Sequence, residues 1–566
     1  MTERIWLKSY PAGIPADIDI SGYGSVLDFF DETIRKYTDK PAFSNFGKHL
    51  SFSRLDEMSQ AFAGYLQKLG GLQQGDRVAI MMPNLLQYPV VLFGILRAGM
   101  TVVNINPLFT ARELEAQLKD SGAKAIIVLE NFAATLQKVI GNTAIEHVIT
   151  SQIGDMMATP KRWLLNFAVK RIKKMVPHWH LPSAIPLRRA LQQGEFAPFQ
   201  PITVTHDDIA FLQYTGGTTG VSKGAMLTHA NLLAALEQIN QWISGSFREA
   251  KEIVISPLPM YHIFCLTSTL GFMKWGSLNV LITNPRDLPR FVKELRKWKF
   301  SVITGVNTLF SGLLHTPGFE KLDFSALKVV VGGGAAVQKP VAERWREVTG
   351  AYVTEAYGLT ETSPGVCCVP LGAPWDGTIG LPVSSTEVSI RNEAFEELPL
   401  WDGQSDIEHC TGEICVRGPQ VMKGYWNNPD ETARTLQDGW LKTGDIGYMD
   451  IHGYVRITDR KKDMILVSGF NVYPNEVESV VAAHPGVAEC AAIGVPDEHS
   501  GEAVRLLVVR KDREMTREDL LAYCRTQLTG YKLPRHIEFR DSLPKTPIGK
   551  ILRRELRDEF RSNSGR

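Results

Sequence analysis

Short apolar segments alternate with helical segments between residues 76 and 128 of this chain. The predicted elements are, in order, a strand at 76–81, a helix at 88–98, a strand at 100–104, a helix at 110–121 and a strand at 123–128. Similar strand–helix units recur around 302–306 and 328–334. Because a crossover helix lays the next strand parallel to the last, this pattern predicts a largely parallel α/β sheet with ligand sites at its strand ends.

Residues 214–224, YTGGTTGVSKG, combine four glycines, five hydroxyl side chains and one lysine just after a predicted strand at 209–212. A glycine-rich turn lets backbone N–H groups converge on an anion, and hydroxyl and ammonium groups add donors. A helix is predicted from His229, with Thr228 as its N-cap. The spacing is not that of a Walker A loop, because glycine follows Lys223. We interpret the stretch as a phosphate-binding turn; a flexible surface loop is the alternative.

Length and composition exclude several classes of protein. A chain of 566 residues exceeds one hydrophobic core, so two or more domains are expected. The net charge of +1 gives no global attraction to nucleic acid. The seven cysteines form no CxxC pair, which predicts a reduced cytoplasmic protein without a disulfide framework or zinc site. The N-terminus has no secretory h-region, and the longest apolar run, 89–103, is interrupted by Arg97, so no membrane span is expected.

The segment 156–194 carries eight Lys or Arg residues and no Asp or Glu. Trp163, Phe167 and Trp179 are among its apolar and interfacial side chains. A basic amphipathic segment with tryptophans can lie on an anionic membrane, which would place the protein peripherally on the inner face of the cytoplasmic membrane. The alternative is a helix that covers the core with its tryptophan face. The sequence leaves both interpretations open.

The pattern changes near Asp459. The charged run 459–463 is followed by a new series of elements: a helix at 474–483, strands at 490–495 and 504–509, and a helix at 517–528. We therefore predict an N-terminal domain over 1–458, a hinge over 459–463 and a C-terminal domain over 464–566, a normal domain size.

Several motifs in the second half combine chemically useful residues. In Tyr357-Gly358-Leu359-Thr360-Glu361-Thr362 an aromatic ring that can stack on a base precedes a hydroxyl and a carboxylate that suits Mg²⁺, although a strand-to-helix turn would look similar. Four further stretches follow it, GWLKTGD at 439–445, GYVRITDRKKD at 453–463, SGFNVYP at 468–474 and PKTPIGK at 544–550.

With these motifs in this order, the chain resembles the adenylate-forming superfamily of acyl-CoA synthetases, luciferases and peptide-synthetase adenylation domains over nearly its whole length. Residues 438–478 are similar to the signature of bacterial long-chain fatty-acyl-CoA synthetases. The resemblance implies a large N-terminal α/β domain of several subdomains, joined by a hinge to a small mobile C-terminal α+β domain. It also implies ATP, Mg²⁺ and coenzyme A as cofactor and co-substrates, and a fatty acid that is joined to AMP and then to CoA, for fatty-acid uptake and β-oxidation.

The resemblance further implies roles for individual residues. Residues expected to hold the β- and γ-phosphates are Thr215, Gly216, Gly217, Thr218, Thr219, Gly220 and Lys223. Thr215 and Glu361 would manage the Mg²⁺. Tyr357 and the Gly332–Gly334 turn, with Gly333 and Gly334, are expected to flank adenine, and Thr360 to lie near the α-phosphate. Asp445 and Arg460 are expected at the ribose, and Gly358 also belongs to the expected nucleotide site.

Lys550 is the residue expected to assist adenylation, since a compact ammonium can bridge the carboxylate and the α-phosphate. Relatives rotate the C-terminal domain about the position of Asp459, which would present first Lys550 and then the Gly469 region. His262 lies in the family's PxxH segment near the acyl carboxylate, with a positioning role. Some long-chain relatives have an aromatic gate a few residues later, where this chain has Leu266, so the gate lies elsewhere or the tunnel is built differently.

Other functions compete with that of a long-chain fatty-acid–CoA ligase. Two use the same scaffold: a medium-chain or aryl-CoA ligase, and a fatty-acyl-AMP ligase that loads a carrier protein. The latter class tends to carry an insertion near the hinge, which the compact run DRKKDMILVSG lacks. A catalytically silent nucleotide-binding or membrane-associated scaffold is disfavoured by the complete set of motif residues. The sequence does not fix chain-length preference or oligomeric state, and a homodimer, known in relatives, is left open.

Overall fold

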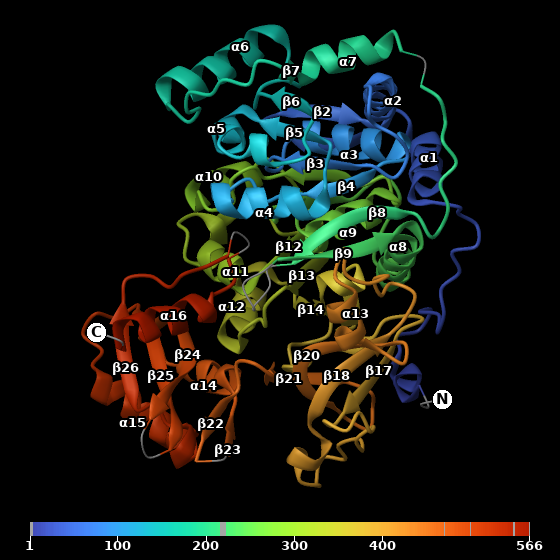
Figure 1. Cartoon of the computed structure of the whole chain (residues 1–566). Coiled ribbons are helices and arrows are strands. Elements are labelled where there is room, and N and C mark those ends of the chain that lie inside the picture. The colour runs from blue at the N-terminus through green and yellow to red at the C-terminus, as the bar shows by residue number, and fades with distance from the viewer. Residues whose placement is uncertain are drawn as a thin grey trace.

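The computed structural model describes residues 4–197, 199–215, 222–468, 470–497, 500–546 and 549–564 (Figure 1). They form four β-sheets with helices packed against them. Three sheets lie within residues 41–460 and the fourth within residues 465–540. This arrangement confirms the predicted fold class, a large N-terminal α/β part followed by a smaller C-terminal part.

The first sheet has seven strands in the order β7-β6-β5-β3-β4-β8-β9. They are β3 (Arg77–Met81), β4 (Thr101–Asn104), β5 (Ala125–Leu129), β6 (His147–Ser151), β7 (Ile185–Pro186), β8 (Ile209–Thr215) and β9 (Lys223–Thr228). All neighbouring pairs are parallel except β8 and β9. The predicted parallel order of the early strands is thus confirmed.

The second sheet has nine strands in the order β16-β15-β14-β13-β12-β10-β11-β1-β2. They are β1 (Pro41–Asn45), β2 (Lys48–Ser51), β10 (Ile253–Ser256), β11 (Leu278–Leu281), β12 (Val302–Gly305), β13 (Val329–Gly333), β14 (Val353–Gly358), β15 (Gly365–Cys368) and β16 (Leu381–Pro382). Its centre, from β14 to β1, is parallel, and its edges are antiparallel. One buried apolar cluster runs across the first two sheets and joins them into a single body.

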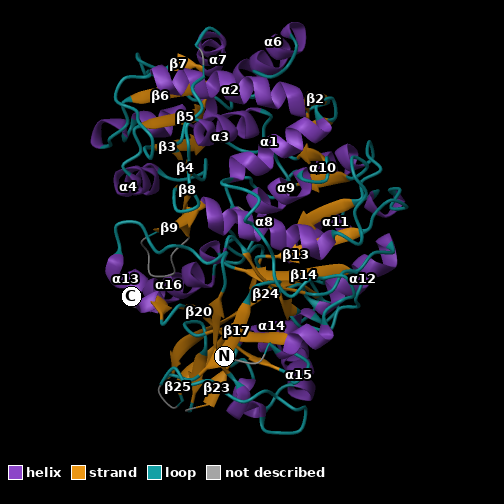
Figure 2. Cartoon of the chain, turned by 90° about the vertical axis from the view of Figure 1, so that its right-hand side faces the viewer, coloured by secondary structure: helices purple, strands orange, loops and turns teal. Residues whose placement is uncertain are grey.

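Helices fill the connections and flank the sheets (Figure 2). Those of the N-terminal part are α1 (Val26–Tyr37), α2 (Phe52–Lys68), α3 (Gln87–Arg97), α4 (Ala111–Ser121), α5 (Ala133–Gln137), α6 (Thr159–Phe167), α7 (Leu187–Glu195), α8 (His229–Ile243), α9 (Ile263–Met273), α10 (Leu288–Leu295), α11 (Asn307–Leu314), α12 (Lys339–Thr349) and α13 (Pro429–Thr435). Every residue of α3 is buried, and Arg97 is neutralised there by Asp31 and Asp56, each 2.6 Å away. Among the helices of the described residues, none is both long and apolar enough to cross a bilayer.

The third sheet is antiparallel and was not predicted as a separate unit. Its strands are β17 (Glu387–Arg391), β18 (Gly412–Arg417), β19 (Leu436–Gln437), β20 (Trp440–Met449) and β21 (Val455–Arg460). β20 and β21 pair so that Asp445 lies opposite Arg460. The sheet therefore brings two of the predicted nucleotide residues together.

The fourth sheet contains β22 (Ile465–Val467), β23 (Phe470–Val472), β24 (Val487–Asp497), β25 (Gly501–Arg510) and β26 (His536–Arg540). The helices α14 (Pro474–Ala482), α15 (Arg517–Gln527) and α16 (Arg553–Ser564) cover it. Its apolar residues form two clusters of their own, separate from the cores of the N-terminal part. In Figure 1 the fourth sheet lies at the lower left and the third sheet at the lower right, both below the first two sheets.

The glycine-rich stretch 214–224 connects two antiparallel strands. Tyr214 and Thr215 end β8, and Lys223 and Gly224 begin β9, so both ends of the expected turn belong to strands. Its tip, residues 216–221, lies outside the described part of the chain. The predicted cap is confirmed, because the hydroxyl of Thr228 accepts a hydrogen bond of 3.2 Å from the backbone N–H of Asn231 in α8.

Within the basic segment 156–194, α6 lies on the surface with apolar side chains outward, whereas Leu187 and Leu191 of α7 are buried. No residue of α6 is buried, and the side chain of Trp163 is 64% exposed. Leu164 and Phe167 are also largely exposed. The alternative in which the tryptophan face covers the core is therefore wrong for α6.

Candidate active site

The ends of four strands supply the predicted nucleotide residues. β13 ends at Gly333, β14 ends at Gly358, and a short 3₁₀ turn (Thr360–Thr362) follows β14. At Gly358 an added Cβ would lie 1.5 Å from the carbonyl oxygen of Pro364, so only glycine fits. Thr215 and Lys223 face each other at the end of the β8–β9 hairpin. The sheets thus place residues that are distant in sequence around one space.

Asp445 is a buried carboxylate with two donors. The Tyr357 hydroxyl donates to its Oδ2 at 2.6 Å, and the Arg460 Nε lies 2.9 Å from its Oδ1. Burial and the neighbouring Asp445 charge raise the pKa of Tyr357 well above its ordinary value, so the phenol keeps its proton. The predicted adenine and ribose residues therefore form one connected cluster.

Lys550 is held in a docked loop of the C-terminal part. Its backbone N–H donates to the Thr546 Oγ1 at 3.0 Å, and Thr308 Oγ1, at the start of α11, donates to the Gly549 carbonyl at 3.0 Å. The charge of Arg460 and burial lower the pKa of Lys550 from 10.5 to about 7. Lys550 thus lies within the electrostatic reach of the Asp445 cluster, although 90 positions separate it from Arg460 and 105 from Asp445 in sequence.

His262 precedes α9 and caps it. Its Nδ1 accepts a hydrogen bond of 3.4 Å from the backbone N–H of Phe264. Burial, and then the charge of Lys550, lower the pKa of His262 to about 4, so the ring is neutral at neutral pH. A neutral ring that accepts at Nδ1 carries its proton on Nε2, which leaves this N–H as a donor for a ligand.

The predicted phosphate and magnesium residues have protein partners that the sequence did not reveal. The Tyr425 hydroxyl donates to the Glu361 Oε1 at 2.7 Å. Lys223 forms an ion pair with Glu431 in the first turn of α13, and its ammonium lies 5.4 Å from the Tyr425 ring centre. The capping motif that starts α13, with Asn428 as N-cap and Glu431 three residues later, was the available sequence signal for this turn.

One cavity of about 740 Å³ joins these residues. The predicted site residues that line it are Thr215, Lys223, His262, Gly334, Tyr357, Gly358, Thr360, Glu361, Arg460 and Lys550. Asp445 and Gly333 do not line the cavity but contact residues that do. Asp445 bonds to Tyr357 and Arg460, and Gly333 lies against the Phe264 ring. Gly216, Gly217, Thr218, Thr219, Gly220 and Gly469 lie outside the described residues.

The same cavity has a second, apolar part. It is lined by side chains of α8 and α9, among them Ala235, Ile239, Trp242, Ile243, Phe264 and Phe272. Leu266, the residue at the expected gate position, is fully buried, and the first aromatic side chain after His262 that lines the cavity is Phe264. The cavity can therefore hold a polar nucleotide and an apolar group at once.

The residues present suit a magnesium ion that is shared with phosphate. Among the described residues there is no group of three or more His, Cys, Asp or Glu side chains that could hold a metal by itself. Mg²⁺ is commonly held by one or two carboxylates together with substrate phosphates. Glu361, with its partner Tyr425 donating to only one carboxylate oxygen, fits that requirement.

Asp459, the predicted hinge residue, is fully buried in a network of donors. Its Oδ1 accepts from the Arg460 backbone N–H at 2.7 Å, and its Oδ2 accepts from the Asn475 backbone N–H at 2.7 Å. Arg553 approaches it at 3.3 Å and binds Glu478 at 2.6 Å. These contacts tie the end of β21 to α14 and α16 of the C-terminal part.

Comparison with known proteins places the chain in a family. A model described as AMP-binding enzyme matches residues 30–426, and a model of the AMP-binding enzyme C-terminal domain matches residues 476–550. The chain is 55% identical to a long-chain-fatty-acid–CoA ligase of Escherichia coli O6:H1 and 37% identical to one of Bacillus subtilis, with 99% of each chain covered in both cases. Its fold is similar to that of ATP-bound MatB from Rhodopseudomonas palustris, with a TM-score of 0.79 and 28% identity over 95% of this chain and 99% of that one. The chain therefore belongs to the family of AMP-binding enzymes.

Proposed function

We propose that this chain is a long-chain fatty-acid–CoA ligase. In the first step a carboxylate oxygen of the acid attacks the α-phosphorus of ATP, and the bond to the β-phosphate oxygen breaks to release pyrophosphate. In the second step the thiolate of coenzyme A attacks the acyl carbonyl carbon, and AMP leaves. The observation that carries the proposal is the single cavity in which Lys550 and the nucleotide residues meet an apolar part between α8 and α9.

We assign Asp445 and Arg460 to the ribose, and Tyr357 with the 333–334 turn to adenine. A carboxylate oxygen accepts more than one hydrogen bond, so Asp445 can accept from ribose hydroxyls while it keeps its protein partners. Thr360 is assigned to the α-phosphate. This assignment rests on the shared cavity and on the buried Asp445 cluster.

We assign the β- and γ-phosphates to Lys223 and the 215–220 stretch. Glu361 and Thr215 would hold Mg²⁺ together with the phosphates, and the ion would supply neutralisation of their negative charge. Lys550 would bridge the reacting carboxylate and the α-phosphate, and the negative charge of both would favour its protonated form despite its lowered pKa. His262 would position the carboxylate through its Nε2–H.

We propose that residues 459–463 act as a hinge between an N-terminal domain (1–458) and a C-terminal domain (464–566). Lys550 lines the cavity in this conformation, which supports assigning the conformation to the adenylation step. A rotation about Asp459 would replace Lys550 by the Gly469 region for thioester formation. Such alternation lets one cavity serve two steps while it protects the adenylate from water.

The proposed reaction is tested by incubating the purified protein with ATP, Mg²⁺ and oleate, with and without CoA, and identifying products by mass. Oleoyl-CoA, AMP and pyrophosphate are expected. Oleoyl-AMP that accumulates and ignores CoA would favour the carrier-loading ligase. Absence of oleate-dependent AMP, with turnover of a medium-chain or aromatic acid, would replace the long-chain substrate by that acid.

The apolar part of the cavity should set the acyl chain length. Ala235, Ile239 and Ile243 follow one another at four-residue spacing on α8 and all line the cavity. Ile239→Trp should lower kcat/KM for oleate by about 100-fold through overpacking, but change that for hexanoate by less than about threefold. Ser244→Trp, at the exposed end of α8, is the control and should leave both substrates unaffected. Equal losses for both acids would place the acyl chain elsewhere.

We also propose that the segment 156–194 docks on an anionic membrane surface. Its exposed Trp163, Leu164 and Phe167 would enter the interface, and its basic residues would face anionic headgroups. The protein should cosediment with vesicles that contain phosphatidylglycerol and much less with neutral vesicles. Equal sedimentation with both would contradict the electrostatic part of this proposal.

A further inference from the structure

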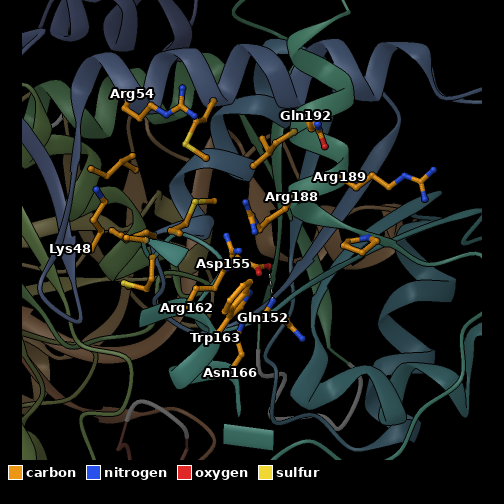
Figure 3. A pocket seen from close by; sticks show the side chains of 18 of the residues that line it. Lys48, Arg54, Gln152, Asp155, Arg162, Trp163, Asn166, Arg188, Arg189 and Gln192 are labelled. Atoms are coloured by element: carbon orange, nitrogen blue, oxygen red, sulfur yellow. Dashed lines mark hydrogen bonds between the residues drawn. The ribbon is translucent and has the colours of Figure 1, made fainter. Parts of the chain in front are cut away.

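A second large cavity lies at the other end of the molecule from the C-terminal part. It is a hollow of about 1760 Å³ between α2, α6 and α7 and the strands β2 and β6, and we call it the α6 hollow (Figure 3). No described residue lines both this hollow and the candidate active site. In Figure 1, α6 and α7 lie at the top, far from the C-terminal sheet. The α6 hollow is therefore not part of the site proposed for catalysis.

Basic side chains predominate in the α6 hollow. Six of them line it: Lys48, Arg54, Arg162, Lys170, Arg188 and Arg189. The acidic lining residues are Asp39, Glu130, Asp155 and Glu195. Arg54 lies 3.8 Å from Glu195, and Lys170 lies 3.8 Å from Glu130. Two of the six cations thus have acidic partners within the lining.

The remaining cations lack an ion pair among the described residues. Arg162 and Arg188 reach toward the middle of the hollow from α6 and α7, whereas Arg189 extends away from it (Figure 3). The charge of Arg188 acts on Asp155, whose pKa burial nevertheless raises. The Asp155 carboxylate already accepts from Ser151 Oγ at 3.0 Å and from the backbone N–H of Gln152 at 2.8 Å. The two guanidinium groups therefore present donors to a further anion, and their planar shape suits the paired oxygens of a phosphate.

The rim of the hollow is apolar and open to solvent. Trp163 and Phe167, one helical turn apart on α6, line the hollow and are 64% and 59% exposed. Leu164 of α6 and Ile172 of the following turn do not line the hollow but are each 70% exposed. Polar contacts fix this helix to the body, since Asn166 Oδ1 accepts from the Gly154 N–H and Lys161 donates to the Phe46 carbonyl. A ligand with an anionic head and apolar tails matches the basic interior and the apolar rim.

We propose that the α6 hollow binds the anionic headgroup of one membrane phospholipid, with Arg162 and Arg188 on its phosphate and the acyl tails along the apolar rim. This inference rests on the proposed membrane docking of 156–194 and adds to it a defined lipid class and binding residues. A specific headgroup site would fix the orientation of the protein on the membrane, which diffuse attraction of surface charge does not do.

The test uses dihexanoylphosphatidylglycerol, a short-chain lipid that is soluble below its micelle concentration, in calorimetric titration of the full chain. Saturable binding of one lipid per chain is expected, with dihexanoylphosphatidylcholine at least about tenfold weaker. The double variant Arg162→Gln/Arg188→Gln should weaken binding by about tenfold or more, the loss expected for charge-assisted hydrogen bonds. The matched control Arg171→Gln/Lys173→Gln removes two charges of the same segment outside the hollow and should change binding by less than about twofold.

Equal weakening by the two double variants, or equal binding of the two lipids, would overturn the headgroup site. Binding of decanoate at the same residues without binding of the phospholipid would assign the hollow to a free carboxylate instead and would also overturn it. Both double variants should form decanoyl-CoA at the wild-type rate without vesicles, which checks their fold. If the protein binds vesicles but not the soluble lipid, the headgroup site is wrong and the membrane docking is still supported. If the protein binds the soluble lipid but not vesicles, the membrane docking is wrong and the headgroup site is still supported.

Discussion

Replacing Lys550 by methionine should lower the rate of acyl-adenylate formation about 10³-fold, as expected when one group that stabilises transition-state charge is removed. Lys550 lines the cavity together with Thr360 and Glu361 and is held there by the Thr308–Gly549 hydrogen bond. Methionine keeps most of the side-chain length but has no charge to place between two anions. The measurement is oleate-dependent pyrophosphate release from ATP without CoA.

Thioester formation from synthetic oleoyl-AMP and CoA is the internal control for this variant. The rate of thioester formation should fall less than about tenfold in Lys550→Met, because the conformation proposed for that step has Lys550 outside the cavity. Lys511→Met, at an exposed position of the C-terminal part, should leave both half-reactions unchanged. Similar losses in both half-reactions would contradict a role confined to adenylation.

The lowered pKa of Lys550 gives the same variant a second measurable effect. Between pH 7 and pH 10.5 the unfolded chain binds a proton on this lysine that the folded chain does not bind. The contribution of Lys550 to the free energy of unfolding therefore increases as pH rises through this window. The Tm of the wild type relative to that of Lys550→Met should rise from about pH 7 to about pH 9. A difference in Tm that is independent of pH would contradict the lowered pKa.

The substitution Asp459→Pro should block thioester formation more than adenylation. Proline fixes φ near −65° and so restricts the rotation that the proposed hinge requires. We expect the rate from synthetic oleoyl-AMP and CoA to fall by about 100-fold or more, and pyrophosphate release by about tenfold or less. The ratio of the two rates is the measured quantity, because Asp459 is fully buried and its loss also lowers the Tm.

Asp459→Asn is the matched variant for this experiment. It keeps the side-chain shape and an acceptor oxygen but leaves the backbone free to rotate. It should lower the Tm, since it weakens the contact with Arg553, while the ratio of the two half-reactions stays near that of the wild type. An equal change of ratio in both variants would assign the effect to the lost carboxylate and remove the evidence for a hinge at this position.

The sequence predicted the fold where local pattern decides structure. Apolar runs such as 123–128 became buried parallel strands, and Thr228 caps α8 as its side chain predicted. The hairpin from β8 to β9 was missed because the glycine-rich stretch reads as a loop, although both of its ends pair in a strand ladder. The third sheet was missed as a unit because long connections separate β17 from β18 and β18 from β19, so no local pattern shows that these strands pair.

In the candidate site, too, the sequence predicted local motifs but not the contacts between them. The motif residues were found because each lies in a recognisable run, but their mutual contacts join residues far apart in sequence. The Tyr357–Asp445 bond spans 88 positions and the Lys223–Glu431 pair spans 208. The apolar part of the cavity is made by single side chains of α8 and α9 that look like ordinary core residues in a helix. No sequence pattern distinguishes those side chains from the rest of either helix.

With Lys223 assigned to the β- and γ-phosphates as proposed, its ion pair with Glu431 would make triphosphate recognition a competition between phosphate and carboxylate. Glu431 satisfies the lysine in the free protein, so a phosphate gains only the difference between its own attraction and that of the carboxylate. A nucleotide that ends at the α-phosphate has no further phosphate to replace Glu431 as the partner of Lys223. Such a ligand would leave the Lys223–Glu431 ion pair intact. Because only the longer phosphate chain would displace the Glu431 carboxylate, the site would distinguish a nucleoside triphosphate from the monophosphate of the same nucleoside.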